Sequence, residues 1–163
     1  MGIMKIELSS MVAALFLVAP CMAQGLKINT GTTFKTTAGV SLVVQNGNIV
    51  NNGNGDFLKS NVYLTGGTVA NIDGTSPVSV SNLYINKPAS SAVLKLDVNV
   101  TNNVVFQNGL LDLNGHNISL SPAGLLVGET EASRITGALG GYVSITVDLD
   151  APWGIIPATW EPR

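Results

Sequence analysis

The stretch NVYLTGG, residues 61–67, decides the fold because it returns at a fixed interval. Twenty-one residues later the chain reads NLYINKP, residues 82–88, and after the same interval it reads NVVFQNG, residues 103–109. Each copy begins with an asparagine, continues with three apolar residues and ends in turn-forming residues. Self-similarity at a fixed period is typical of repeat architectures.

Set in register, the copies define columns of like residues. The aligned sets are Asn61, Asn82 and Asn103; Val62, Leu83 and Val104; Tyr63, Tyr84 and Val105; and Leu64, Ile85 and Phe106. The same step predicts that 124–127 and 40–43 continue the series on either side and that 145–147 follows. Val127 is thereby expected to join the column of Leu64.

Short alternating segments occupy much of the remaining chain from Gln24 onward. Apolar residues recur at every second position in Val78–Val80, Leu94–Val100, Leu111–Leu113 and Ile118–Leu120, which predicts strands of these lengths. Asn-Gly, Gly-Gly and Lys-Pro pairs separate most of them, as expected for turns. Since no segment shows a 3.6-residue apolar period, we expect an all-β chain.

Two all-β architectures fit short strands with regular turns. In an antiparallel β-sandwich nothing requires strands to resemble one another at a constant interval. In a single-stranded parallel β-helix, or β-solenoid, aligned residues of successive coils lie about 4.8 Å apart in the same environment. The fixed step favours the solenoid with coils of about 21 residues, and the sandwich is the alternative.

The solenoid interpretation makes further predictions. Asn61, Asn82 and Asn103 should form a structural amide ladder, and Tyr63 should stack on Tyr84. Residues 26–147 are long enough for five to six coils. Because open coil ends need covering, we expect caps at Gly25–Ile28 and in the less regular stretch from Glu129 onward.

The N-terminus has the features of a secretory signal peptide at 1–23. Lys5 precedes an apolar segment at 11–19, and Cys21-Met22-Ala23 resembles a cleavage site, so the mature chain should begin at Gln24. Nine apolar residues are too few to cross a bilayer, which needs about 20. A lipoprotein acylated at Cys21 is the alternative, but Pro20 stands where such signals have a small residue.

Composition excludes several classes of partner and site. Cys21 is the only cysteine, so the mature chain would have no disulfide, thiol nucleophile or cysteine metal site. A net charge of −2 with 11% charged residues argues against nucleic acid or an anionic membrane surface as a partner. We expect no membrane span in the mature chain.

No catalytic, cofactor-binding or metal-binding residue is predicted. His116, the only histidine, follows Asn114-Gly115 in an expected turn and should be a solvated surface residue. The acids from Asp56 to Asp150 do not share a column at the 21-residue step, and Asp97 and Asp112 have no basic residue at their register. The calcium-loop-like 52–56 lacks the required spacing of ligands, which favours a turn.

The pattern resembles β-rich repeat regions of large exported surface proteins of Bacteroidetes-type bacteria, the substrates of type IX secretion. The resembling segments are 83–87, 94–100, 109–115, 133–137 and 140–143, within roughly 60–150. The resemblance implies a secreted or surface-attached scaffold rather than a known enzyme. It also implies a longer chain with a C-terminal sorting domain, which this chain does not match.

These observations divide the chain into the signal peptide (1–23), a solenoid domain (24–150) and an irregular tail (151–163). The tail holds Trp153, Trp160 and three prolines. It is either a genuine segment or cap, or the product of a frameshift or truncation in a longer gene. We expect a non-enzymatic structural or adhesive module at the cell surface, with surface glycans or surface proteins as partners. The alternative is a carbohydrate-active β-helix enzyme, a polysaccharide lyase or hydrolase.

Overall fold

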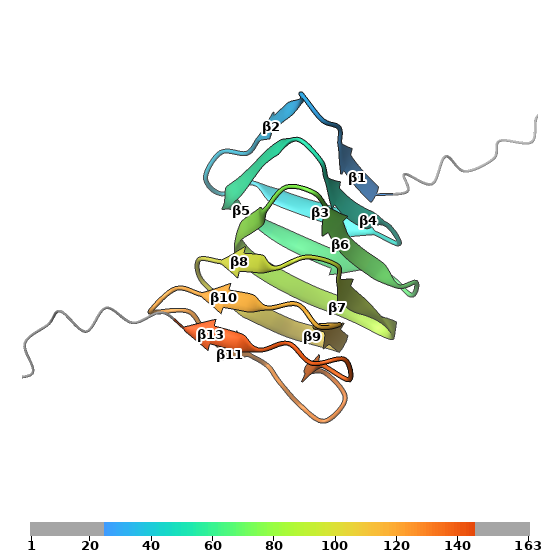
Figure 1. Ribbon diagram of the computed structural model, residues 1–163. Helices are drawn as coiled ribbons and strands as arrows, with labels where there is room; N and C mark the ends of the chain where they lie inside the picture. The colour runs from blue at the N-terminus through green and yellow to red at the C-terminus, as the bar shows by residue number, and fades with distance from the viewer. Residues whose placement is uncertain (1–24, 146–163) are drawn as a thin grey trace, which may run out of the picture.

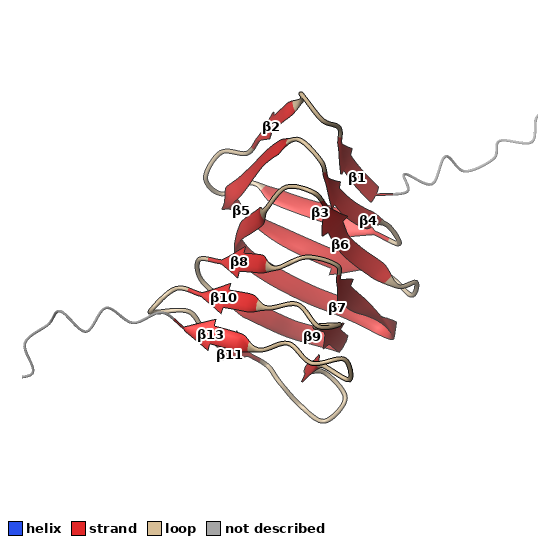
Figure 2. Cartoon of the chain, in the orientation of Figure 1, coloured by secondary structure: helices blue, strands red, loops and turns tan. Residues whose placement is uncertain are grey.

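The chain forms a stack of parallel β-coils. The computed structural model describes residues 25–145, and the expected signal peptide and the tail lie outside the described residues. Every regular element of this part is a strand (Figure 2). The strands follow one another down the stack in sequence order, from β1 to β13 (Figure 1).

Each coil passes through three faces, which we call the β1 face, the β2 face and the tyrosine face, in that order. The β1 face consists of β1 (Gly25–Ile28), β4 (Asn48–Asn51), β6 (Ala70–Gly74), the ends of β7 (Val78–Leu94) and β9 (Val104–Asp112), and β12 (Ile135–Thr136). The β2 face consists of β2 (Thr33–Lys35), the starts of β5 (Asn54–Thr65) and β7, β8 (Val98–Val100), β10 (Ile118–Leu120) and β13 (Val143–Ile145). The tyrosine face consists of β3 (Ser41–Gln45), the end of β5, the middle of β7, the start of β9, and β11 (Leu126–Val127).

All pairs between these strands are parallel, and six strand segments stack on the β1 face. Among the described residues the one antiparallel contact is an isolated bridge between Thr130 and Ser133. The fold is therefore a β-solenoid of about six coils, as the repeat predicted, and the β-sandwich alternative is wrong.

The predicted columns are confirmed in the central coils. Paired residues along the tyrosine face are Val62, Leu83 and Val104; Tyr63, Tyr84 and Val105; and Leu64, Ile85 and Phe106. Leu64, Leu83 and Ile85 are fully buried, so these strands turn one set of side chains into the core. One coil has too few such residues to offset its ordering entropy, and stacking shares the burial between neighbours.

The register expected at the two ends is wrong by one residue. Val127 pairs with Val105, not with Phe106, because the coil from Val104 to Leu126 has 22 residues. At the other end Ser41 pairs with Asn61. Ile145 lies on the β2 face beside Leu120, not in the tyrosine-face series, because the last coil carries a long loop before β12. Thr146 and Val147 lie outside the described residues.

Two expectations about strands and caps also need correction. The alternation of Leu94–Val100 is not one strand, since β7 ends at Leu94, the chain turns a corner, and β8 begins at Val98. β5 and β7 are longer than predicted because they continue around corners. Gly25–Ile28 is an ordinary strand of the first coil, and the stretch after Glu129 supplies β12 and β13 of the last coil.

Candidate functional site

The outward side of the tyrosine face carries three rows of side chains. Strand alternation turns 61, 63 and 65 away from the buried Val62 and Leu64, and register repeats this on each coil. The middle row is Val43, Tyr63, Tyr84, Val105 and Val127; one flanking row is Ser41, Asn61, Asn82 and Asn103; the other begins Gln45, Thr65 and Asn86. The face thus combines an apolar and aromatic ridge with polar borders.

Tyr63 and Tyr84 stack on each other as predicted. Their ring centroids are 4.2 Å apart and the ring planes differ by 9°. Because this separation matches the distance between coils, the rings stand edge-on to the outside and their flat sides face along the stack. The two tyrosines therefore expose their ring edges and hydroxyl groups to solvent, and not the flat sides of their rings.

The Tyr84 hydroxyl stays protonated well into the alkaline range. Burial, followed by the neighbouring Tyr63, raises the pKa of Tyr84 above its usual value of 10.0. A neutral phenol both donates and accepts hydrogen bonds. The ridge can therefore meet a neutral hydroxylated ligand at ordinary pH.

The predicted asparagine ladder is present. Asn82 donates from Nδ2 to Oδ1 of Asn61 over 2.8 Å, and Asn82 Oδ1 accepts from the backbone N–H of Asn103 over 3.1 Å. Asn103 Oδ1 in turn accepts from the N–H of Leu125 over 3.1 Å. Much of the hydrogen-bonding capacity of this row is used within the stack, so its main role is structural.

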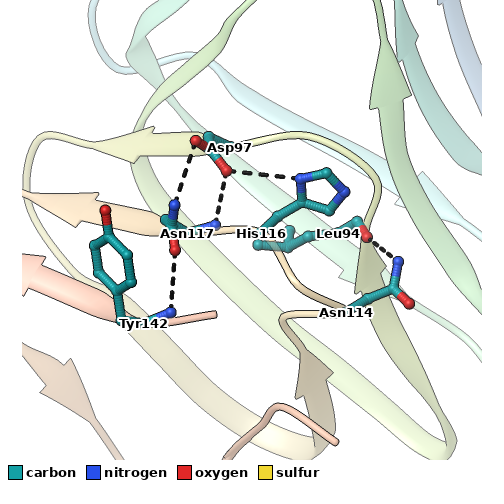
Figure 3. A network of polar contacts seen from close by, with 6 residues as sticks. All are labelled: Leu94, Asp97, Asn114, His116, Asn117 and Tyr142. Atoms are coloured by element: carbon teal, nitrogen blue, oxygen red, sulfur yellow. Dashed lines mark hydrogen bonds and ion pairs between the residues drawn. The ribbon is translucent and has the colours of Figure 1, made fainter. Parts of the chain in front are cut away.

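A second polar site lies at the corner between the β1 and β2 faces (Figure 3). Asp97 Oδ1 is 3.6 Å from His116 Nδ1 and accepts a hydrogen bond from the N–H of Asn117 over 2.8 Å. Asn117 Oδ1 accepts from the N–H of Tyr142 over 3.2 Å. Asp97 therefore binds the backbone of Asn117 and lies close to His116, and the ladder from Asp97 through Asn117 to Tyr142 joins three coils.

The same corner borders an open hollow of about 590 Å³ whose lining includes Lys95, Ser119, Asp97 and His116. The His116 side chain is 35% exposed, so it lies at the surface beside this hollow. Because Nδ1 faces the Asp97 carboxylate, Nε2 is the ring nitrogen that a substrate could reach. Among the described residues no hydroxyl donates to His116, so a serine–histidine relay is not assembled.

The other acidic side chains named below bind separate groups rather than one common site. Asp73 binds the N–H of Gly74, Asp112 binds the N–H of Asn114, and Glu131 pairs with Arg134 at 3.0 Å. Within residues 25–145 no three histidine, cysteine or acidic side chains gather to hold a metal. Asp148 and Asp150 lie outside the described residues.

The calcium-like segment 52–56 begins in a bend and continues into β5. It borders a hollow of about 340 Å³ together with Lys35 and Asn51. The Oδ1 atom of the buried Asn51 has no hydrogen-bond partner there, while its Nδ2 donates to the carbonyl of Pro77 over 2.8 Å. A lysine in the lining disfavours a cation, and one carboxylate is too few for calcium.

Lys87 is a buried lysine that the sequence analysis missed. It is 0% exposed at the corner where β7 leaves the tyrosine face, and its Nζ donates to the carbonyl of Thr65 over 2.8 Å. It forms no ion pair with any described residue. Burial lowers the pKa of Lys87 below 10.5. The strand alternation that turns Leu83 and Ile85 inward also turns Lys87 inward, which is the signal that could have found it.

Replacing Lys87 by methionine should leave the chain as stable as before at neutral pH, or more stable by at most about 1–2 kcal/mol. The change removes a desolvated charge, and the Thr65 carbonyl still accepts from the N–H of Asn46. The lowered pKa means that the folded chain binds this proton less tightly than the unfolded chain. The free-energy cost of burying the charged ammonium of Lys87 is therefore fully present at neutral pH, and it falls as the pH rises toward 10.5.

Urea unfolding of Lys87→Met and the natural chain, followed between neutral pH and pH 10.5, measures this difference. The advantage of the variant should shrink as the pH rises. Lys95→Met is the matched control, because Lys95 is exposed on the next corner. A large loss of stability at neutral pH in Lys87→Met would contradict this account.

No known protein family, curated protein or solved structure matches this chain. In residues 25–145 no helix is long and apolar enough to cross a membrane.

Proposed function

We propose that the chain is a non-enzymatic scaffold of an exported surface protein and that its tyrosine face contacts surface glycans. The observation that supports this is the ridge of Tyr63 and Tyr84 on a flat face with amide and hydroxyl borders. Tyrosine offers a rigid contact area with a polar tip, and it loses little conformational entropy on binding. Sugar hydroxyls match the donors and acceptors of the phenols and of the border row that begins Gln45, Thr65 and Asn86.

The stack suits this role mechanically. A parallel ladder on three faces fixes the spacing of the outward rows, so an extended glycan meets preorganised groups at each coil. The expected signal peptide at 1–23 and the resemblance to exported Bacteroidetes-type surface proteins support a secreted or surface location. Other cell-surface proteins are an alternative partner for the same face.

The test is binding of the purified chain to an array of glycans, followed by titration of any positive class. We expect the Tyr63→Ala, Tyr84→Ala double variant to bind at least about tenfold more weakly, since tyrosines are frequent hot spots. Asn99→Ala, an exposed change on the β2 face, is the control and should bind normally. Circular dichroism confirms that each variant folds.

Two results would contradict the proposal. One is the absence of binding to every glycan class, which would leave a spacer or a protein-binding scaffold. The other is an equal loss of binding in Asn99→Ala, which would move the contact away from the tyrosine face.

A carbohydrate-active enzyme is the second candidate, favoured by the Asp97–His116 pair beside its hollow. It predicts new reducing ends when the chain is incubated with polysaccharides, with and without calcium. His116→Gln should abolish that activity and leave glycan binding by the tyrosine face unchanged. No product across acidic and neutral polysaccharides would remove this candidate.

A further inference from the structure

The ladder on the β2 face is interrupted between the second and third coils. On one side of the interruption β2 pairs with β5 over three residues, and on the other β7 pairs with β8 over three residues. Between them, among the described residues, β5 and β7 meet on this face in the one pair Phe57 and Val80. Pro77 precedes this part of β7 and has no N–H to donate to a ladder. The two strands therefore leave a gap in the sheet.

The open hollow of about 340 Å³ beside Asn51, which we call the Asn51 hollow, lies at this gap. Its lining comes from both coils and consists of Lys35, Asn51, residues 53–56, residues 76–77 and Ser79. The volume is at the lower end of the range found for small-molecule pockets in proteins. The hollow therefore has room for one small ligand, about the size of a single sugar unit.

The side chain of Asn51 supplies an unused hydrogen-bond acceptor in this lining. Asn51 is 1% exposed, and its Nδ2 donates to the carbonyl of Pro77 over 2.8 Å. That bond fixes the orientation of the amide, because a flipped amide would set two acceptors against each other. Its Oδ1 has no partner in the described part of the chain. Since a buried acceptor without a hydrogen bond is destabilising, a ligand that donates to Oδ1 gains affinity from this atom.

The other polar groups of the lining disfavour an ion. Lys35 and Asp56 are paired residues on adjacent coils, so opposite charges lie on the same wall. The ammonium repels a cation, and the carboxylate repels an anion. Ser79 Oγ accepts from Asn99 Nδ2 over 3.3 Å, so its own hydroxyl can donate to a ligand. The hollow thus combines hydrogen-bond donors and acceptors without a net charge.

We propose that the Asn51 hollow binds one neutral sugar unit, with one of its hydroxyl groups donating to Oδ1 of Asn51. Because a hydroxyl group both donates and accepts, neighbouring hydroxyls on one ring match the mixed donors and acceptors of this lining. The site lies on the β2 face, whereas the proposed glycan contact uses the tyrosine face. It therefore goes beyond the proposed function and is tested separately from it.

A chemical-shift titration of the full-length chain by nuclear magnetic resonance tests the site. The probes are glucose, galactose and N-acetylglucosamine, with acetate and methylammonium as charged probes. We expect at least one of the sugars to shift the backbone amide signals of residues 53–56, Ser76 and Ser79, and the side-chain amide signals of Asn51. The dissociation constant should be about 1–10 mM, since small ligands bind weakly in open sites. The charged probes should leave these signals unchanged.

Two variants locate the contact. Asn51→Leu keeps the size of the side chain and removes Oδ1, so it should weaken sugar binding by at least about tenfold. Ser79→Met leaves Asn51 in place and extends an apolar side chain over the hollow, and we expect the same loss. Because Asn51→Leu also removes the bond to Pro77, Ser79→Met decides the test if the first variant does not fold.

Ser144→Met is the matched control, because Ser144 ends the outward row of the β2 face to which Ser79 belongs. It should bind the sugar within about twofold of the natural chain. Circular dichroism shows whether each variant folds.

Three results would overturn the proposal. One is that no sugar shifts the signals of the lining, which would mean that a water molecule alone satisfies Oδ1 of Asn51. Another is sugar binding that is unchanged in Ser79→Met. The third is binding of acetate or methylammonium in the hollow without binding of any sugar. Shifts confined to the strands around Tyr63 and Tyr84 would support the tyrosine-face contact and contradict this site, so the two proposals can fail independently.

Discussion

Replacing Leu83 by alanine is expected to lower the free energy of unfolding by about 3–5 kcal/mol. Leu83 is fully buried in the middle of the column that also holds Val62 and Val104. The coils on either side are fixed by ladder hydrogen bonds, so they cannot close on the cavity that truncation leaves. Urea unfolding followed by circular dichroism measures the loss.

Leu126→Ala is the matched control because it removes the same atoms from the end of the same column. Leu126 is only partly buried, so we expect a loss of about 1 kcal/mol. Equal losses at the two positions would show that burial does not rise toward the centre of the stack.

The architecture was predictable because stacked coils give aligned residues the same surroundings. The step of 21 residues from Asn61 to Asn82 to Asn103 identified three successive coils, and the pairing of Tyr63 with Tyr84 followed from it. That prediction needed no knowledge of the other two faces. It depended only on the recurrence of like residues within each column.

The register at the ends was not predictable from the same step, because corner loops set the length of each coil. In Leu125-Leu126-Val127 every residue is apolar, so a shift of one residue leaves the pattern unchanged while it exchanges inward and outward side chains. The structure turns Leu126 inward and leaves Leu125 60% exposed. A run in which every residue is apolar does not indicate which of its side chains point into the core.

The contact between Asp97 and His116 was missed for a related reason. Along the β2 face Val98 pairs with Ile118, a step of 20 residues rather than 21. Asp97 therefore lies over Asn117, and His116 falls beside it at the corner. Local coil length, which the sequence does not state, decides which side chains meet at a corner.

Gly109→Ala is expected to lower the free energy of unfolding by about 2–5 kcal/mol. Gly109 has φ of +79°, and a Cβ there would overlap the backbone carbonyl oxygen of Lys87 on the neighbouring coil. The left-handed backbone accounts for about 1–2 kcal/mol. Overpacking against an atom held in the stack adds about 1–3 kcal/mol.

Gly39 separates the two causes, because it has φ of +81° but nothing within 4 Å of an added Cβ. Gly39→Ala should therefore show only the backbone cost of about 1–2 kcal/mol. Gly67, which has open space and no positive φ, should accept alanine without loss. If urea unfolding gave Gly39→Ala and Gly109→Ala the same cost, close approach of coils at this corner would not be what requires glycine.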